Sequence, residues 1–112
     1  MDINIKELKT VNEVNSVVNE LVTLRHELMN EVLEKPVVSK NTNKEGRITS
    51  IDSKKLFVNF ECWSSVPVSL DNYQEIIETS EEIRNKINEF IETFKDERRL
   101  NLLRMRLVKY TS

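Results

Sequence analysis

Residues 46–70 constrain the fold most, because this stretch holds the only Gly, the only Trp and the only Cys of the chain. Between residues 55 and 62, apolar side chains recur at every second position, which is the period of a half-buried strand. The shared apolar face comprises Leu56, Val58, Phe60 and Cys62. The regions before and after this stretch have the apolar spacing of helices. The sequence therefore predicts a small sheet between helices.

The order of segments around this strand resembles a known class of small barrels. A strand begins at Gly46, a polar turn follows at residues 52–54, and the strand of residues 55–62 leads to a second extended stretch, VPVSL. In this order, residues 46–77 resemble SH3-like and KOW-like barrels. Such barrels bind proteins, peptides or nucleic acid, so the resemblance implies a binding module and no particular chemistry. Three strands are evident where a barrel has about five, and we expect the helices to cover an open sheet.

Length and composition favour one domain built largely of helix, spanning residues 1–112. Charged residues make up 32% of the chain, and one Gly and two Pro leave few breaks, which favours long helices. The formal net charge of −2 argues against attraction of nucleic acid by the whole surface. A single Cys, the absence of a signal-peptide core and the absence of an apolar run of about 20 residues predict a cytoplasmic protein that does not span a membrane.

Residues 3–35 are interpreted as one long helix. Its apolar positions recur at steps of three and four, as in a heptad. They are Val11, Val14, Val18, Leu21, Leu28 and Val32, with Arg25 at the intervening heptad position. Pro36 is expected to end this helix, because proline disfavours helical geometry at the preceding residue. Residues 37–45 are mostly polar, and we predict a surface connection that begins with at most a brief extended piece.

A second helical region covers residues 79–109, after a stretch that fits either a last strand or a helical turn (residues 73–77). Thr79 and Glu82 have the spacing of a capping box. The first apolar set of this region comprises Ile83, Ile87, Phe90, Ile91 and Phe94. A second set, Leu100, Leu103 and Leu107, points roughly the opposite way at about 100° per residue. Either the helix breaks near residues 96–97 or one helix offers its second face to another surface, and we therefore predict a homo-oligomer.

No residue pattern supports catalysis, and we expect no enzyme activity, no cofactor and no metal. His26 is the only histidine and falls outside the apolar positions of the first helix, which indicates a plain surface residue. Cys62 shares the apolar strand face and is interpreted as a small core residue. The chain has no further Cys or His for a metal site and no glycine-rich phosphate loop.

Two surfaces are candidates for binding a partner. Residues 95–109 carry six basic residues against two acidic ones. On a helix, four of the six fall within a stripe about 80° wide. These four are Lys95, Arg99, Arg106 and Lys109. Pairing with the helix C-terminus and with acidic residues of the same chain explains these charges equally well. Trp63, between two predicted strands, and Phe57, on the polar side of its strand, either pack on the sheet or anchor a partner.

Together these features predict an α+β protein: a long N-terminal helix, a small antiparallel SH3-like sheet, and one or two C-terminal helices packed on the first. We expect it to bind a protein partner without catalysis. The short chain, rich in Asn, Ile, Lys and Glu, resembles in composition the small inhibitors of phages and mobile elements, including anti-CRISPR proteins. That resemblance implies inhibition of a host protein such as a CRISPR effector, which is a nucleic-acid-handling enzyme.

Two other functions fit the sequence. A nucleic-acid-binding accessory protein would use the basic C-terminal helix together with a basic rim of the sheet. The residues for this alternative are Arg47, Lys54, Lys55, Arg98 and Arg104, with Lys40 and Lys44 on the same rim. A structural subunit of a helical oligomer would use the surplus apolar faces. An acidic stretch is interpreted as a solvated face, as a mimic of nucleic acid or as a docking face for a basic partner; it comprises Glu78, Glu81, Glu82, Glu89 and Glu92.

Overall fold

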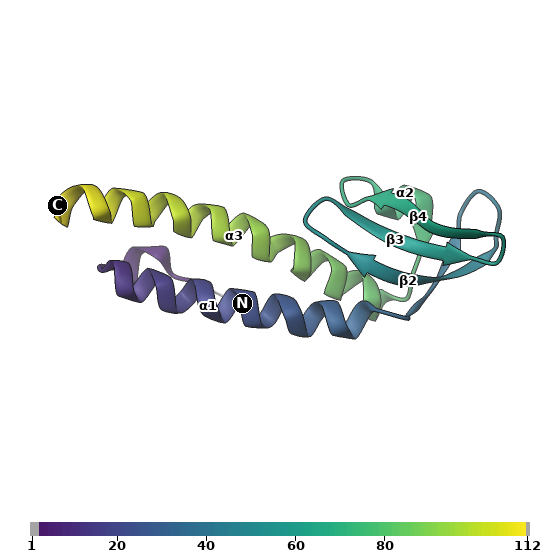
Figure 1. Cartoon of the computed structure of the whole chain (residues 1–112), viewed down its shortest axis with the longest axis horizontal. Helices are drawn as coiled ribbons and strands as arrows, with labels where there is room; N and C mark the ends of the chain where they lie inside the picture. Colours follow the sequence, from purple (N-terminus) through teal and green to yellow (C-terminus); the bar gives the residue numbers. More distant parts are fainter. Residues whose placement is uncertain (1–2, 112) are drawn as a thin grey trace.

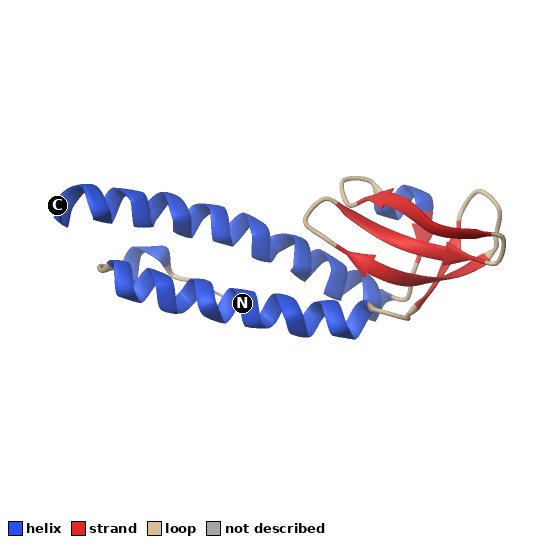
Figure 2. Ribbon diagram, viewed as in Figure 1, coloured by secondary structure: helices blue, strands red, loops and turns tan. Residues whose placement is uncertain are grey.

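The chain folds into a pair of antiparallel helices with a five-stranded antiparallel sheet at one end (Figure 1, Figure 2). The computed structural model describes residues 3–111. The molecule is elongated, with principal extents of 56 × 20 × 19 Å. Within the described residues, no helix is both long and apolar enough to cross a bilayer. The α+β class and the order of helix, sheet and helix expected from the sequence are confirmed.

The first long helix, α1, covers Val11–Val32, and a short 3-10 helix, η1 (Ile5–Glu7), precedes it. The prediction of one helix over residues 3–35 is therefore wrong at both ends. At the start, the Thr10 Oγ1 accepts a hydrogen bond from the Glu13 amide at 3.1 Å and lies 3.2 Å from Glu13 Oε1. Thr10 is therefore the N-cap, and it begins the helix later than the apolar spacing alone suggests.

At its other end, the chain leaves α1 before the proline. Glu34 has a positive φ of 66°, and its carbonyl accepts a hydrogen bond from Arg47 Nη1 at 2.9 Å. Pro36 then opens a strand, β1 (Pro36–Ser39), in which Val37 is buried. The brief extended piece allowed for at the start of residues 37–45 is therefore a strand of the sheet, and it contributes Val37 to the core.

The remaining strands are β2 (Glu45–Ile51), β3 (Lys55–Phe60), β4 (Trp63–Ser69) and β5 (Ile77–Glu78). Their order is β4-β3-β2-β1-β5, and every neighbouring pair is antiparallel. Gly46 is required where β2 meets β3, because a Cβ there would lie 2.7 Å from Phe60 Cδ1 and 2.8 Å from the Asn59 carbonyl oxygen. Cys62 is exposed in the turn after β3. The prediction of a core cysteine is wrong, because the hairpin already turns after Phe60.

The stretch after β4 contains both alternatives left open by the sequence: the helical turn α2 (Tyr73–Ile76) is followed directly by β5. The last helix, α3, is continuous over Glu81–Thr111. Its capping residue is Ser80, whose Oγ accepts from the Ile83 amide at 3.3 Å, whereas Thr79 Oγ1 donates to the Ser80 carbonyl at 3.1 Å. The expected capping box of Thr79 and Glu82 is therefore wrong, because the helix begins one residue later with a simple cap from Ser80.

Two apolar clusters fill the interior. The larger lies between the sheet and the adjoining halves of both helices and includes Leu28, Val32, Ile48, Leu56, Val58, Ile87 and Phe90. The smaller holds the distal halves together, with Val14, Leu21 and Leu100 at its centre and Ile5, Leu8, Leu103 and Leu107 around them. The first apolar set of α3 thus packs with the sheet, and the second packs with α1 and the N-terminal segment. Both opposed sets pack within one chain, so the second set does not require another copy, and the homo-oligomer stays a prediction.

Candidate functional site

Beyond the sheet, α3 is covered along one side by α1 and the N-terminal segment (Figure 1). Met105 lies 18 positions after Ile87, and Val108 lies 18 positions after Phe90, which is about five helical turns in each case. Ile87 and Phe90 are buried in the cluster shared with the sheet. The side of α3 that packs with the sheet therefore continues past the sheet as exposed surface.

This surface gathers most of the exposed apolar bulk of the described residues. Leu102, Met105 and Val108 are 58%, 63% and 50% exposed. Within residues 3–109, Trp63 is the only other large apolar side chain that is exposed. We call Leu102, Met105 and Val108 the apolar patch. Single exposed apolar residues are common on proteins, but a group on one side of a helix is typical of an interaction surface.

Basic residues surround the centre of this patch. On a helix, the neighbours of a side chain are three, four and seven positions away. For Leu102 these neighbours are Lys95, Arg98, Arg99, Met105, Arg106 and Lys109. Every neighbour except Met105 is basic, and none is acidic. The continuous helix therefore aligns the predicted basic stripe around an apolar centre.

Two of these basic residues have acidic partners on α3 itself. Lys95 Nζ lies 3.1 Å from Glu92 Oε1, and Arg99 Nη1 lies 3.6 Å from Asp96 Oδ1. The Lys95 pair and the Arg99 guanidinium are well exposed to solvent. Exposed pairs of this kind contribute only about 0–1 kcal/mol, so a partner can replace them at little cost.

Arg104 differs from the other basic residues because its side chain turns toward α1. Its Nη1 donates to Asn15 Oδ1 at 3.0 Å and its Nη2 donates to Asn101 Oδ1 at 2.8 Å. It is therefore engaged within the protein. Arg98 and Arg106, in contrast, are exposed and form no ion pair with the other described residues.

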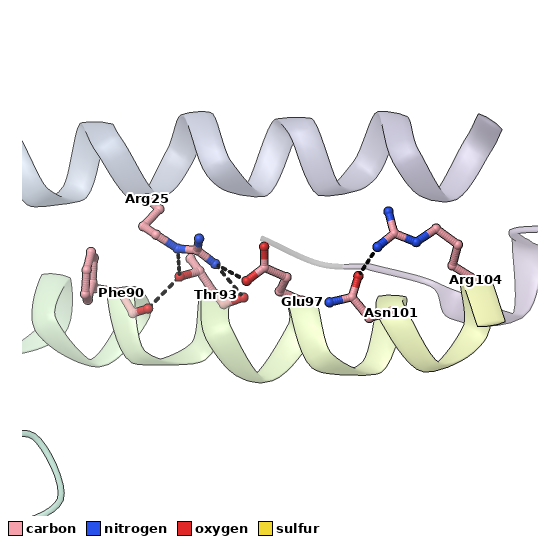
Figure 3. A network of polar contacts seen from close by, with 6 residues as sticks. All are labelled: Arg25, Phe90, Thr93, Glu97, Asn101 and Arg104. Atoms are coloured by element: carbon pink, nitrogen blue, oxygen red, sulfur yellow. Dashed lines mark hydrogen bonds and ion pairs between the residues drawn. The ribbon is translucent and has the colours of Figure 1, made fainter. Parts of the chain in front are cut away.

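A polar layer between the two apolar clusters fixes the rotation of α3 against α1 (Figure 3). Arg25 donates from Nε to Thr93 Oγ1 at 3.2 Å and from Nη2 to Glu97 Oε2 at 3.0 Å. Thr93 Oγ1 donates in turn to the Phe90 carbonyl at 2.6 Å. The Arg25 guanidinium also lies 3.8 Å from the centre of the Phe94 ring. Because these contacts determine which side of α3 faces α1, they also determine which side faces outward.

Trp63 and Phe57 are separated from this surface and from each other. Trp63 pairs with Phe60 at the turn end of the β3–β4 hairpin, whereas Lys55, at the other end, adjoins α3. Phe57 is half-buried and lies opposite Pro67 on the face of β3 that points away from the core. The structure does not bring Trp63, Phe57 and the basic stripe into one surface.

The basic rim predicted for the sheet is divided between its two ends. Lys40 and Lys44 flank the β1–β2 turn, whereas Lys54 and Lys55 belong to the β2–β3 turn and the start of β3, at the opposite end. Only the second pair reaches α3, where it lines a cleft of about 570 Å³ together with Arg98. We call this cleft the corner cleft, because it lies where the sheet meets α3.

No catalytic arrangement is evident in the part of the chain that the structure describes. His26 and Cys62 are both exposed, and residues 3–111 contain no group of three or more His, Cys, Asp or Glu placed to hold a metal ion. In the cleft between α2 and α3, the Tyr73 hydroxyl donates to Asn88 Oδ1 at 2.6 Å. Burial raises the pKa of Tyr73 above its usual value, so it acts as a structural hydrogen-bond donor at neutral pH.

The sequence reasoning found the basic stripe but missed the apolar patch at its centre. A usable pattern was present, because Met105 and Val108 repeat the helical positions of Ile87 and Phe90 after about five turns. What the pattern could not show is where the sheet ends along α3, and hence which apolar residues it leaves uncovered.

Comparison with protein-family models, with curated proteins and with solved structures gives no match for this chain. The likeness of residues 46–77 to SH3-like barrels and the compositional likeness to phage inhibitors therefore stay expectations. The assignment of a function rests on the apolar patch, the basic residues around it and the corner cleft.

Proposed function

We propose that this protein is a non-catalytic binding module that holds a protein partner against the outward side of distal α3. The observation that carries the proposal is the apolar patch of Leu102, Met105 and Val108 within a ring of basic side chains. An apolar centre excludes water from a contact, and a charged rim steers the partner and fixes its orientation.

A protein partner fits this surface better than nucleic acid does. Nucleic-acid sites present cations to phosphates and aromatic rings to bases. Here the centre of the surface is aliphatic, no aromatic side chain among the described ones is exposed beside it, and Arg104 is turned inward. Phosphates could contact the basic residues around Leu102, but they would leave the apolar side chains of Leu102 and Met105 uncovered, whereas a protein partner can cover both.

The proposal also accommodates the inhibitor function that the composition suggests. A small protein that occupies a surface of its target needs an exposed anchor and a rigid scaffold, and it needs no catalytic group. The polar layer around Arg25 supplies the rigidity by fixing the two helices against each other.

A capture experiment with matched variants tests the proposal. Lysate of the organism that encodes the chain is passed over immobilised wild type, Leu102→Asp and Trp63→Asp, and retained proteins are quantified by mass spectrometry. Both replaced residues are exposed, at 58% and 67%, so both variants should fold. We expect a protein that wild type and Trp63→Asp retain and Leu102→Asp loses. A partner that Leu102→Asp retains and Trp63→Asp loses would move the site to the far end of the sheet and refute the proposal.

A further inference from the structure

The corner cleft lies at the inner end of the proposed docking surface. Arg98, on its wall, is four positions before Leu102 and therefore lies beside it on the same side of α3. The opposite wall is formed by Lys54 and Lys55, from the turn between β2 and β3. A segment of a partner that covers Leu102 and runs along α3 toward the sheet would therefore end between these three basic side chains.

The turn that carries Lys54 and Lys55 on one wall of the cleft is held by contacts of its backbone. Asp52 Oδ1 accepts hydrogen bonds from the amides of Lys54 and Lys55, both at 2.8 Å. The Lys54 carbonyl accepts from the Leu70 amide at 2.9 Å, which ties the turn to the end of β4. The backbone of this turn is therefore fixed against the end of β4.

The balance of charge in the cleft favours an anion. Three basic residues line it, and the acidic residues on its wall are Asp71 and Glu97. Glu97 is already engaged with Arg25 Nη2 at 3.0 Å. An acidic group that enters the cleft therefore meets Lys54, Lys55 and Arg98, and it is opposed by Asp71 on the wall and by Asp52 in the turn that carries the two lysines.

We infer that the partner is an acidic amphipathic helix, with apolar side chains that cover the apolar patch and with Asp or Glu side chains at one end that enter the corner cleft. This inference rests on the proposed function and adds the chemistry of the partner. Apolar anchors at helical spacing laid on an apolar surface are a common mode of helix recognition, and charge complementarity then selects acidic flanks.

Other occupants match the surface less well. A second copy of this chain offers acidic residues on the first half of α3, but the exposed large apolar residues of the described part lie only in the patch itself and at Trp63. Two patches facing each other would also bring together the basic residues that surround them, whose like charges repel. A flat anionic membrane laid against distal α3 would also meet the sheet, which projects beside the first half of that helix (Figure 1).

Selection from a random peptide library tests the chemistry of the partner. We expect enriched peptides with apolar residues at three- and four-residue steps and Asp or Glu clustered at one end. The affinity of one such synthetic peptide is then measured for wild type, Leu102→Asp, Lys54→Glu/Lys55→Glu and Lys40→Glu/Lys44→Glu. The last variant makes the same change of charge at the opposite end of the sheet and serves as the control.

The expected pattern separates this inference from the proposed function. We expect Leu102→Asp to abolish binding, Lys54→Glu/Lys55→Glu to weaken it about tenfold or more, and the control to weaken it less than about threefold. Binding could depend on Leu102 and yet be equal in the two lysine variants. That result would refute the inference that the acidic end of the partner helix enters the corner cleft, and it would leave the proposed function intact. Enrichment of basic or non-helical peptides, or of none, would refute the acidic-helix partner.

Three further measurements address the other occupants. Vesicles with about one-fifth phosphatidylserine, a single-stranded oligonucleotide and self-association by light scattering are each compared between wild type and Leu102→Asp. We expect no difference in any of them. Binding or dimer formation that Leu102→Asp removes would assign the patch to that occupant and refute the inference.

Discussion

The guanidinium of Arg25 and the carboxylate of Glu97 meet at 3.0 Å between α1 and α3, midway between the two apolar clusters (Figure 3). Both side chains are partly buried, with 16% and 28% exposed. A directed charged contact at this place permits one register of the two helices, whereas apolar surfaces alone would tolerate slippage. The outward position of Leu102 is a consequence of this register.

Replacing either member of this pair should destabilise the helix pair. Arg25→Ala loses the contacts with Thr93, Glu97 and the Phe94 ring, and we expect it to lower the free energy of unfolding by about 2 kcal/mol. In a double-mutant cycle with Glu97→Ala, measured by urea unfolding, we expect a coupling of about 1 kcal/mol. A coupling near zero would show that the pair does not fix the register.

Gly46→Ala should destabilise the sheet. The added Cβ would lie 2.8 Å from the Asn59 carbonyl oxygen, a backbone atom that cannot move without disturbing the β2–β3 pairing. We expect a loss of about 2 kcal/mol in the free energy of unfolding. Ser50→Ala, at an exposed position of the same strand, is the matched control and should change stability by less than about 0.5 kcal/mol. Equal stability of both variants would contradict the close approach.

Asp52→Asn should reduce stability at neutral pH and have less effect in acid. Hydrogen bonds from the amides of Lys54 and Lys55 hold the pKa of Asp52 below its usual value of 3.8. Because the folded pKa is lowered, the charged form stabilises the fold above about pH 4, and this contribution is lost as the pH falls through the folded pKa. For this exposed group we expect a difference of about 0.5 kcal/mol at pH 7 that shrinks below pH 4. A difference that is the same at both pH values would mean that charge is not its cause.

Val58→Asp should prevent the sheet from folding. Val58 is fully buried, and a carboxylate there would lack a partner, which costs about 3 kcal/mol or more. His26→Ala, at an exposed position of α1, should leave the thermal midpoint within about 2 °C of wild type. Circular dichroism during heating distinguishes these outcomes. If His26→Ala abolished partner binding while the fold survived, a role for the histidine would have to be considered.

The candidate site could be predicted in part. The spacing of Lys95, Arg99, Arg106 and Lys109 placed them in one stripe, and the continuous α3 carries them on one side. The sequence analysis did not predict that exposed Leu102 and Met105 lie among these basic residues. The exposure of an apolar residue depends on where the neighbouring sheet ends, and the sequence does not show this. The meeting of Arg98 with Lys54 and Lys55 joins residues more than 40 positions apart, and no local pattern relates them.

The sequence by itself determined the classes of the main elements, because periodicity and capping are local properties: α1, β3 and α3 follow from apolar spacing of 3.6 or 2 residues. It did not determine the ends of those elements at Thr10, Ser80 or Phe60, where a capping hydrogen bond or a hairpin turn overrides the spacing. Only the tertiary structure decided which apolar face of α3 packs against the sheet and which packs against α1 and the N-terminal segment. The physical reason is that burial belongs to pairs of surfaces: the sheet covers only the first half of α3, and the same side of the helix is core before the sheet's edge and exposed surface beyond it.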